Sequence, residues 1–204
     1  AVSIEQVKSC LENVLLKNTK IIDLQATNLK EILDDIRKCG KILSKTSEAN
    51  TIVDKFDFKT KQVKKKIKNK HKKKVLCIEW IHPIMLAGNW MPDLIHNVNS
   101  ISVATTSGKH SEFVSNKFLR NLEFDVVIFS PCGYDIKKTF SELNKSQQLK
   151  ELLSNKKKFI VNGNRYFNRP GTSIFESIDI LCEILHPEIF TPQPSFDRWI
   201  KYDL

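Results

Sequence analysis

The chain has 204 residues, of which 41% are hydrophobic and 27% are charged, a composition typical of a soluble globular protein with one good core or two small ones. It contains no run of about 18 apolar residues, so the sequence predicts no membrane-spanning helix. The net charge of +10 is local, because ten of the 33 lysines and arginines fall within residues 59–74 and the other 23 balance the 23 acidic residues. The chain opens at Ala1 without a basic or apolar leader, and we expect a fragment of a longer protein.

The first part of the chain predicts two helices around a short strand. Apolar residues recur at helical spacing over residues 3–16, with Ser3 as a candidate N-cap. Residues 20–24 have the composition of a short strand. Asn28 followed by Glu31 forms a capping-box pattern, and the apolar stripe after it predicts a helix that runs to about residue 43.

A long helix is predicted over residues 46–69. Val63 and Ile67 continue an apolar stripe from Ile52 and Phe56, so we expect one packed face and a lysine-rich face exposed to solvent. Nucleic-acid-binding segments usually mix arginine and aromatic residues with lysine, and residues 59–74 contain neither. We therefore expect no nucleic-acid partner and no specific partner for these lysines.

Strands and helices then alternate, as in a doubly wound α/β fold. The sequence predicts strands at residues 75–78, 124–129 and 158–161, and helices at residues 92–98, 111–119, 135–143 and 172–185. The expected fold class is α/β, a parallel-sheet, three-layer lobe preceded by a long linking helix and a partial first lobe. The expected domains are a remnant of an amino-terminal lobe at 1–45, the linking helix at 46–73, and a carboxyl-terminal α/β lobe with its tail at 74–204.

The five cysteines form no C-x-x-C pair and are odd in number, which argues against a disulfide framework or a zinc knuckle. Cys39, Cys77 and Cys182 lie on apolar stripes or strands, so we expect them in the core.

Three loops follow the predicted strands, and in open α/β sheets such loops face the ligand crevice. Trp80 and Trp90 lie in the first of them, which also contains Pro83, Gly88 and Pro92, residues that interrupt regular structure. We expect both indoles at the mouth of a cleft, where each offers flat apolar area and one N–H donor. The alternative interpretation is that both tryptophans plug the edge of the sheet.

Four motifs on these loops resemble the carboxyl-terminal lobe of cobalamin (vitamin B12) solute-binding proteins of ABC importers. They are E-W-x-x-P at residues 79–83, A-G-x-W-x-P at 87–92, P-C-G-Y-D at 131–135 and Y-F-N-R-P-G at 166–171. The resemblance extends over nearly the whole chain and implies two α/β lobes joined by one long rigid helix. Asn89 stands where this family is expected to carry His, and most of the first lobe, which would supply half of the cleft, is missing.

The resemblance implies a non-catalytic protein that binds cobalamin or a related corrinoid and delivers it to the membrane subunits of an ABC importer. A corrin ring is a broad apolar disc fringed with neutral amides, so a binder needs aromatic and thioether surface together with hydrogen-bonding groups. The expected ligand-binding residues of the first kind are Trp80, Met85, Trp90, Tyr134, Tyr166 and Phe167. Those of the second kind are Asn89 and Asn168.

Some of these residues have structural alternatives. Met85 and Phe167 are as well suited to burial within the lobe, and residues 168–171 to shaping the turn into the last helix. Arg169 is a candidate partner for a carboxylate such as Glu79, bracing the loops.

The resemblance also implies a monomer with no prosthetic group, for which cobalamin is a transported ligand. If the full-length protein is exported, we expect it to be periplasmic or extracellular and membrane-associated, and otherwise cytoplasmic.

Other functions compete with this one. Cys132 precedes a predicted helix and is a candidate nucleophile, although no Cys–His spacing of a thiol hydrolase accompanies it. His82, His96, His110 and His186 with Glu79 match no compact metal-ligand motif, and we assign neither catalytic nor metal-binding residues. Haem or a ferric siderophore is the closer alternative ligand, and a metal-ion carrier the more distant one.

Overall fold

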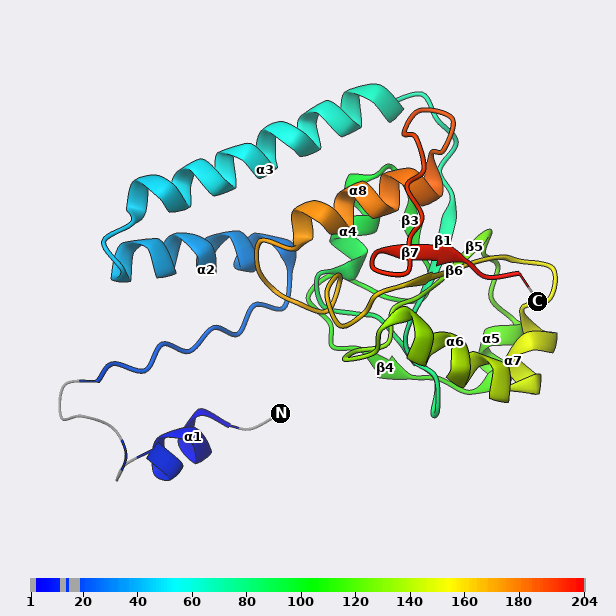
Figure 1. Cartoon of the computed structure of the whole chain (residues 1–204), viewed down its shortest axis with the longest axis horizontal. Coiled ribbons are helices and arrows are strands. Elements are labelled where there is room, and N and C mark those ends of the chain that lie inside the picture. The colour runs from blue at the N-terminus through cyan, green and yellow to red at the C-terminus, as the bar shows by residue number, and fades with distance from the viewer. Residues whose placement is uncertain (1–2, 12–13, 15–18, 204) are drawn as a thin grey trace.

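The computed structural model describes residues 3–11, 14 and 19–203. Helix α1 (Ile4–Leu11) begins after Ser3, whose Oγ accepts the backbone N–H of Gln6 at 3.2 Å while the Gln6 side chain accepts the N–H of Ser3 at 2.8 Å. The predicted N-cap is confirmed, and part of the predicted helix to residue 16 lies outside the described residues. None of the α1 residues is buried, and the helix lies apart from the lobe in Figure 1.

The strand predicted at residues 20–24 is wrong. The segment runs toward α2 (Leu29–Ile42) without regular structure, because no strand of the described chain lies beside it to share its backbone hydrogen bonds. The predicted cap of α2 is confirmed, since the Asn28 side chain accepts the N–H of Glu31 at 2.9 Å. The Glu31 carboxylate reaches back to the N–H of Thr27 at 2.6 Å, one residue earlier than in a standard capping box.

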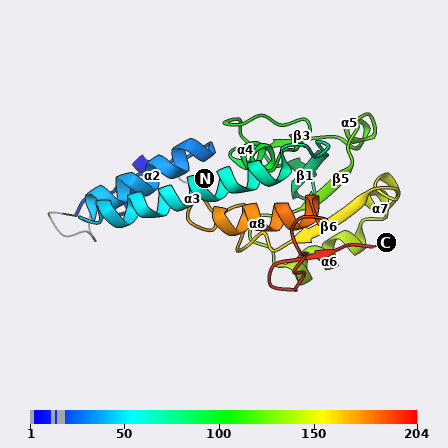
Figure 2. The same ribbon diagram turned by 90° about the horizontal axis from the view of Figure 1, so that it is seen from above.

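Helices α2 and α3 (Thr46–Ile67) form an antiparallel hairpin that projects beyond the sheet (Figure 1). The predicted long helix is confirmed and passes Phe58 without a break. Val53, Phe56, Val63 and Ile67 form its buried face, and from above α3 runs beside α8 (Figure 2).

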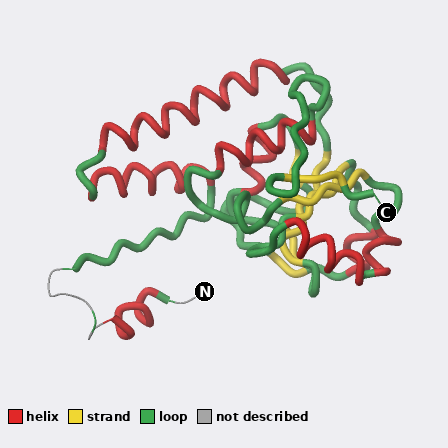
Figure 3. Tube along the Cα trace, in the orientation of Figure 1, coloured by secondary structure: helices red, strands yellow, loops and turns green. Residues whose placement is uncertain are grey.

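The sheet lies beside this hairpin (Figure 3), and its strands have the following bounds within the described residues. They are β1 (Lys74–Trp80), β2 (Met85–Leu86), β3 (Ile101–Ser102), β4 (Glu112–Phe113), β5 (Val126–Phe129), β6 (Lys157–Val161) and β7 (Trp199–Lys201). The order is β4-β2-β1-β5-β6-β7, with β3 paired to the amino end of β1. Strands β1, β5 and β6 are parallel, as predicted, and β3, which the sequence analysis did not predict, is parallel to β1. The connections between these strands are crossovers that carry helices, as parallel pairing requires.

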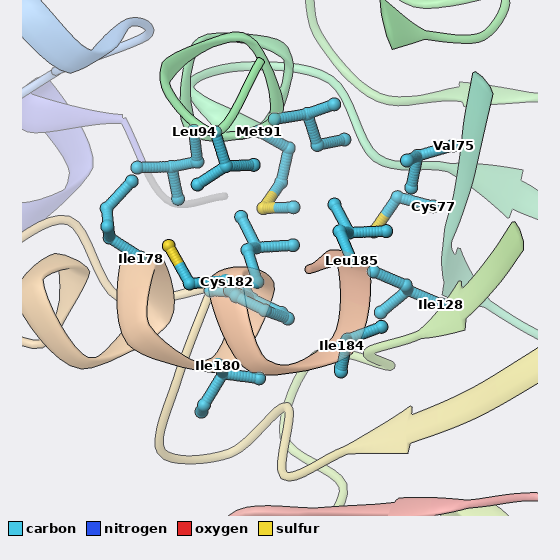
Figure 4. Close-up of a cluster of buried hydrophobic side chains, with 14 of the residues drawn as sticks. Val75, Cys77, Met91, Leu94, Ile128, Ile178, Ile180, Cys182, Ile184 and Leu185 are labelled. Carbon is cyan, nitrogen blue, oxygen red and sulfur yellow. The ribbon is translucent and has the colours of Figure 1, made fainter. Parts of the chain in front are cut away.

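Helices cover both faces of the sheet, which gives the predicted three-layer α/β lobe. Helices α4 (Met91–Asn97) and α8 (Ile174–Leu185) cover one face, and α5 (Asn116–Arg120), α6 (Ile136–Lys145) and α7 (Gln147–Leu152) contribute to the core on the other. Figure 4 shows the first core, where Met91 and Leu94 of α4 meet Cys182 and Leu185 of α8. Alternate residues of the parallel strands enter the two cores, with Cys77 in the first and Ile78 in the second.

The helix predicted over residues 111–119 is wrong in its first half. Glu112 and Phe113 instead form β4, which pairs with β2 in antiparallel register, and the helix starts only after Ser115, whose side chain accepts the N–H of Phe118. Strand β7 closes the other edge, antiparallel to β6.

Two of the cysteines that were expected in the core are there. Cys77 and Cys182 are 3% and 1% exposed, and burial raises the pKa of each thiol to about 12. Cys39 is only partly buried.

No helix in the described part of the chain is long and apolar enough to cross a bilayer.

Candidate functional site

Three loops leave the carboxyl ends of β1, β5 and β6, at residues 81–90, 130–135 and 162–171. Ile78 is the register partner of Phe129, and Phe129 that of Ile160, so the parallel strands end side by side. The loops therefore meet at one edge of the sheet, where open α/β folds bind their ligands.

Direct contacts fix the second and third loops against each other. A Cβ on Gly163 would lie 2.1 Å from the carbonyl oxygen of Pro131, so only glycine permits this approach. The Asn168 side-chain amide donates to the carbonyl oxygens of Ser130 at 2.7 Å and Gly163 at 3.2 Å. Asn168, predicted as a ligand contact, thus uses its donor group to hold the loops together.

Trp80 and Tyr134 form an aromatic pair at this edge. Their ring centroids are 5.1 Å apart at an interplanar angle of 52°, and both residues are half-buried. The Trp80 indole N–H donates to the carbonyl oxygen of His82 at 3.0 Å, and the Lys138 ammonium lies 5.4 Å from the centre of the Tyr134 ring. The pair presents partly exposed flat apolar surface with its orientation already fixed.

Trp90 packs against the core to which α4 and α8 contribute. Its indole N–H donates to the carbonyl oxygen of Phe167 at 2.5 Å. The half-buried ring therefore joins the first loop to the third and keeps only part of its surface for a ligand.

Met85 and Asn89 sit in the first loop region. Met85 is half-buried on β2, in register with Trp80 and with Phe113. Asn89 has φ +50°, a left-handed conformation that asparagine tolerates, and its backbone N–H donates to the Lys109 carbonyl at 2.6 Å. Its side-chain amide makes no hydrogen bond to any described residue, and the residue is half-buried.

Tyr166 and Phe167 are not brought to the surface. They are 1% and 0% exposed, because the third loop folds back so that the N–H of Tyr166 donates to the Asn162 carbonyl at 2.9 Å and that of Phe167 to the Ser177 hydroxyl at 3.2 Å. Burial raises the pKa of the Tyr166 hydroxyl. Both rings support the third loop from below.

Glu79 is a functional candidate that the prediction of ligand contacts omitted. Burial raises the pKa of its carboxyl group, and a hydrogen bond from the Ser111 hydroxyl at 2.5 Å offsets part of that effect. The same hydroxyl accepts the N–H of Gly88 at 3.0 Å. Ser111 thus links the Glu79 carboxylate to the loop that carries Asn89 and Trp90 by two hydrogen bonds. The signal in the sequence was a carboxylate directly after the buried strand residues 75–78.

The sequence suggested that Arg169 pairs with Glu79, and the structure shows a different partner. Its guanidinium donates instead to the backbone carbonyl of Asn164 at 2.6 Å and to the side-chain oxygen of the same residue at 3.0 Å. The interaction is local to the third loop because both residues belong to it.

Cys132 lacks the electrostatics of an activated nucleophile. Burial raises the pKa of its thiol and the nearby Glu79 carboxylate raises it further, whereas Arg169 lowers it. A reactive thiol requires a shift in the opposite direction.

The histidines do not converge on a metal centre. His186 is buried at the end of α8, where its Nε2 lies 2.8 Å from the Val98 carbonyl, and His82 is exposed in the first loop. No group of three or more His, Cys, Asp or Glu side chains in the described residues is arranged to hold a metal ion.

Two cavities are lined in part by residues of the three loops. One of about 300 Å³ is lined by residues 81–84 together with parts of residues 114–116 and 146–149. Another of about 320 Å³ is mainly apolar and lies between the α2–α3 hairpin and residues 170–172 of the third loop. A cavity of about 660 Å³ lies away from the three loops, between α2, α3 and α4.

Comparison with known proteins identifies this architecture. Residues 7–162 match the family model described as periplasmic binding protein. Among curated protein sequences, none matches this chain.

Several solved structures share the fold. An ABC transporter substrate-binding protein from Listeria monocytogenes is 15% identical with a TM-score of 0.73, and the match covers 89% of this chain and 72% of that protein. The vitamin B12 binding protein BtuF of Vibrio cholerae is 14% identical with a TM-score of 0.65, and the match covers 93% of this chain and 71% of BtuF. IsdE of Staphylococcus aureus, solved with heme, is 16% identical with a TM-score of 0.70, and the match covers 89% of this chain and 73% of IsdE.

The family model covers most of the chain, and the solved structures share its fold. The chain belongs to the periplasmic binding protein family.

Proposed function

We propose that this chain binds a corrinoid such as cobalamin at the carboxyl edge of its sheet and delivers it to the membrane subunits of an ABC importer, without catalysis. The observation that carries the proposal is the half-buried Trp80–Tyr134 pair, held in place at the edge where the three loops meet. The vitamin B12 binder of Vibrio cholerae, which has the same fold, supports this choice of ligand.

The chemistry of the edge suits a corrin ring. The Trp80–Tyr134 pair and Met85 offer aromatic and thioether surface to an apolar disc. The free side-chain amide of Asn89 can donate to and accept from a neutral amide on the rim of the ring. Tyr166, Phe167 and Asn168 take part indirectly, by holding the loops that carry these groups.

The two-lobe organisation is part of the same proposal. In it, residues 1–45 belong to an amino-terminal lobe, residues 46–73 form the helix between the lobes, and the ligand lies between two lobes of which residues 74–204 form one. The projecting α2–α3 hairpin and the apolar cavity beneath it, next to residues 170–172, support this arrangement. In this proposal the protein works as a monomer outside the cytoplasmic membrane.

Haem is the second candidate ligand. The structure of IsdE with heme supports it, because the fold is the same. The edge also carries His82 and Tyr134, and both residue types serve as axial ligands of haem iron. A ferric siderophore is an alternative as close as haem, and a metal-ion carrier is the more distant one.

Titration of the chain with cyanocobalamin and with haemin, followed by calorimetry and visible spectroscopy, tests the proposal. We expect weak, saturable binding of cyanocobalamin that the Trp80→Ala/Tyr134→Ala double variant abolishes. The matched control is Phe58→Ala, which removes an aromatic side chain that is 65% exposed on α3. Binding of haemin without cyanocobalamin would replace the corrinoid with haem, and binding of neither would contradict both.

A further inference from the structure

Four lysines form one exposed row near the end of α3. Lys61, Lys64, Lys65 and Lys68 are spaced by three and four residues, so they lie on one face of the helix, and all four are exposed. Phe56, Val63 and Ile67 occupy the buried face. We call these four lysines the cationic row.

Asp57 and Asp93 line the same cavity as Lys61 and Lys64, but neither forms an ion pair with the cationic row. Elsewhere in the same lysine-rich segment, Lys59 pairs with Asp179 at 2.5 Å, Lys70 with Glu188 at 3.4 Å and Lys74 with Glu123 at 2.8 Å. The row lysines make no such ion pair within the described residues. The row therefore carries four positive charges on one face of α3 without an ion-pair partner among the described residues.

Helix stability does not account for this arrangement. Lysines in the last turn interact favourably with the helix dipole, and Lys64 and Lys65 have that position. Like charges three and four residues apart, however, repel one another and destabilise the helix. A negatively charged partner outside the described chain would relieve this repulsion.

We propose that the cationic row is a contact surface for an anionic phospholipid bilayer. Clusters of four to eight lysines or arginines attract anionic lipid surfaces, largely irrespective of detailed geometry. The row consists of lysine point charges on an exposed helix face, without the arginine forks or aromatic stacking groups with which proteins bind nucleic acids. This inference departs from the sequence-based expectation that the lysines have no partner.

The position of the cationic row is compatible with ligand binding at the other end of the lobe. Helix α3 ends at Ile67, shortly before β1 begins at Lys74, so the row is close to the amino edge of the sheet (Figure 1). The Trp80–Tyr134 pair lies at the carboxyl edge. A bilayer in contact with the row leaves the candidate ligand surface open, and the inference holds whichever ligand binds there.

Co-sedimentation of the chain with lipid vesicles tests this proposal. We expect binding to mixed phosphatidylglycerol–phosphatidylcholine vesicles but not to phosphatidylcholine alone. Raising the ionic strength from about 0.01 M to about 1 M should abolish the binding, because the Debye screening length falls from about 30 Å to about 3 Å. Replacing the four row lysines together (Lys61→Gln, Lys64→Gln, Lys65→Gln and Lys68→Gln) should weaken the binding at least about tenfold.

The control variant removes four exposed lysines elsewhere and changes the net charge equally: Lys41→Gln, Lys55→Gln, Lys117→Gln and Lys137→Gln. It should keep most of the binding, and far-ultraviolet circular dichroism should show that both variants are folded. Equal loss in the two variants, or none in the first, would overturn the proposal. Tighter binding to single-stranded RNA than to the anionic vesicles at the same salt concentration would overturn it in favour of nucleic acid.

Discussion

Gly163 lies against the carbonyl oxygen of Pro131 so closely that a Cβ at this position would be 2.1 Å from that oxygen. The two residues belong to the loops after β6 and β5, which carry the aromatic and polar groups of the candidate site. The contact is between backbones and cannot be relieved by rotating a side chain. This close contact holds the loops after β5 and β6 together. The Asn168 side-chain amide adds one hydrogen bond to each loop, to the carbonyl oxygens of Ser130 and Gly163.

Gly163→Ala should therefore destabilise the chain by about 1–3 kcal/mol, the usual cost of overpacking a buried position. Gly171→Ala is the matched control, because nothing lies within 4 Å of a Cβ there and its φ is not positive. Urea unfolding of the two variants measures the difference in the free energy of unfolding. An equal effect at the two glycines would show that the contact with Pro131 does not constrain the loops.

Trp80→Ala should weaken corrinoid binding by about 1–3 kcal/mol, as the loss of a large interface aromatic generally does. The same substitution also removes the ring that orients Tyr134 at a centroid distance of 5.1 Å. Calorimetric titration with cyanocobalamin measures the affinity, and Phe58→Ala provides the exposed aromatic control. Unchanged affinity in Trp80→Ala would exclude the aromatic pair from the site.

Tyr166→Ala should act on stability before it acts on affinity. The side chain is 1% exposed, and truncating a large buried aromatic costs about 3–5 kcal/mol. We expect a lower urea midpoint and, in the fraction that is folded, a corrinoid affinity closer to wild type than that of Trp80→Ala. A stable variant with strongly reduced affinity would instead place Tyr166 at the ligand.

The elements that the sequence predicted correctly have strong local signals. Helices α2 and α3 follow a cap or a long apolar stripe, and β1, β5 and β6 are short runs of buried apolar residues. Strands β2 and β4 have two residues each and depend on their mutual pairing across more than 20 residues of chain. No local pattern of two residues can reveal such a pairing, so residues 111–115 were misassigned to a helix.

The candidate site could be predicted as a set of loops but not as a set of exposed side chains. Parallel strand order alone brings the three loops to one edge. Whether an aromatic residue points outward depends on how its loop folds back, and the hydrogen bond from Tyr166 to Asn162 turns the third loop inward. Sequence reasoning treated Trp80 and Tyr166 alike, although the first is half-buried and the second is in the core.

Replacing Lys64, Lys65 and Lys66 together by Gln should leave corrinoid affinity unchanged. These residues lie in the last turn of α3, near the amino edge of the sheet, whereas the candidate site is at the carboxyl edge. Titration with cyanocobalamin at constant salt concentration provides the measurement. A loss of about tenfold or more would show that the lysines belong to the ligand site.

Glu79→Gln should change how the stability of the chain depends on pH. Burial raises the pKa of this carboxyl group above its unfolded value of 4.5, with a hydrogen bond from Ser111 as a partial offset. The folded state therefore binds the proton more tightly than the unfolded state. This contribution to stability is fully present below pH 4.5 and is lost as the pH rises through the folded-state pKa.

The Gln variant lacks this ionisation and keeps an oxygen that can accept the Ser111 hydroxyl hydrogen bond. Relative to wild type, it should gain stability as the pH rises from 4.5 toward 8, by urea unfolding at a series of pH values. Glu112→Gln, at an exposed position on β4, removes one negative charge without touching the Ser111 network and is the matched control. A difference in the free energy of unfolding between wild type and Glu79→Gln that stays constant across this pH range would contradict the prediction. It would show that burial does not raise the pKa of the Glu79 carboxyl group in the folded state.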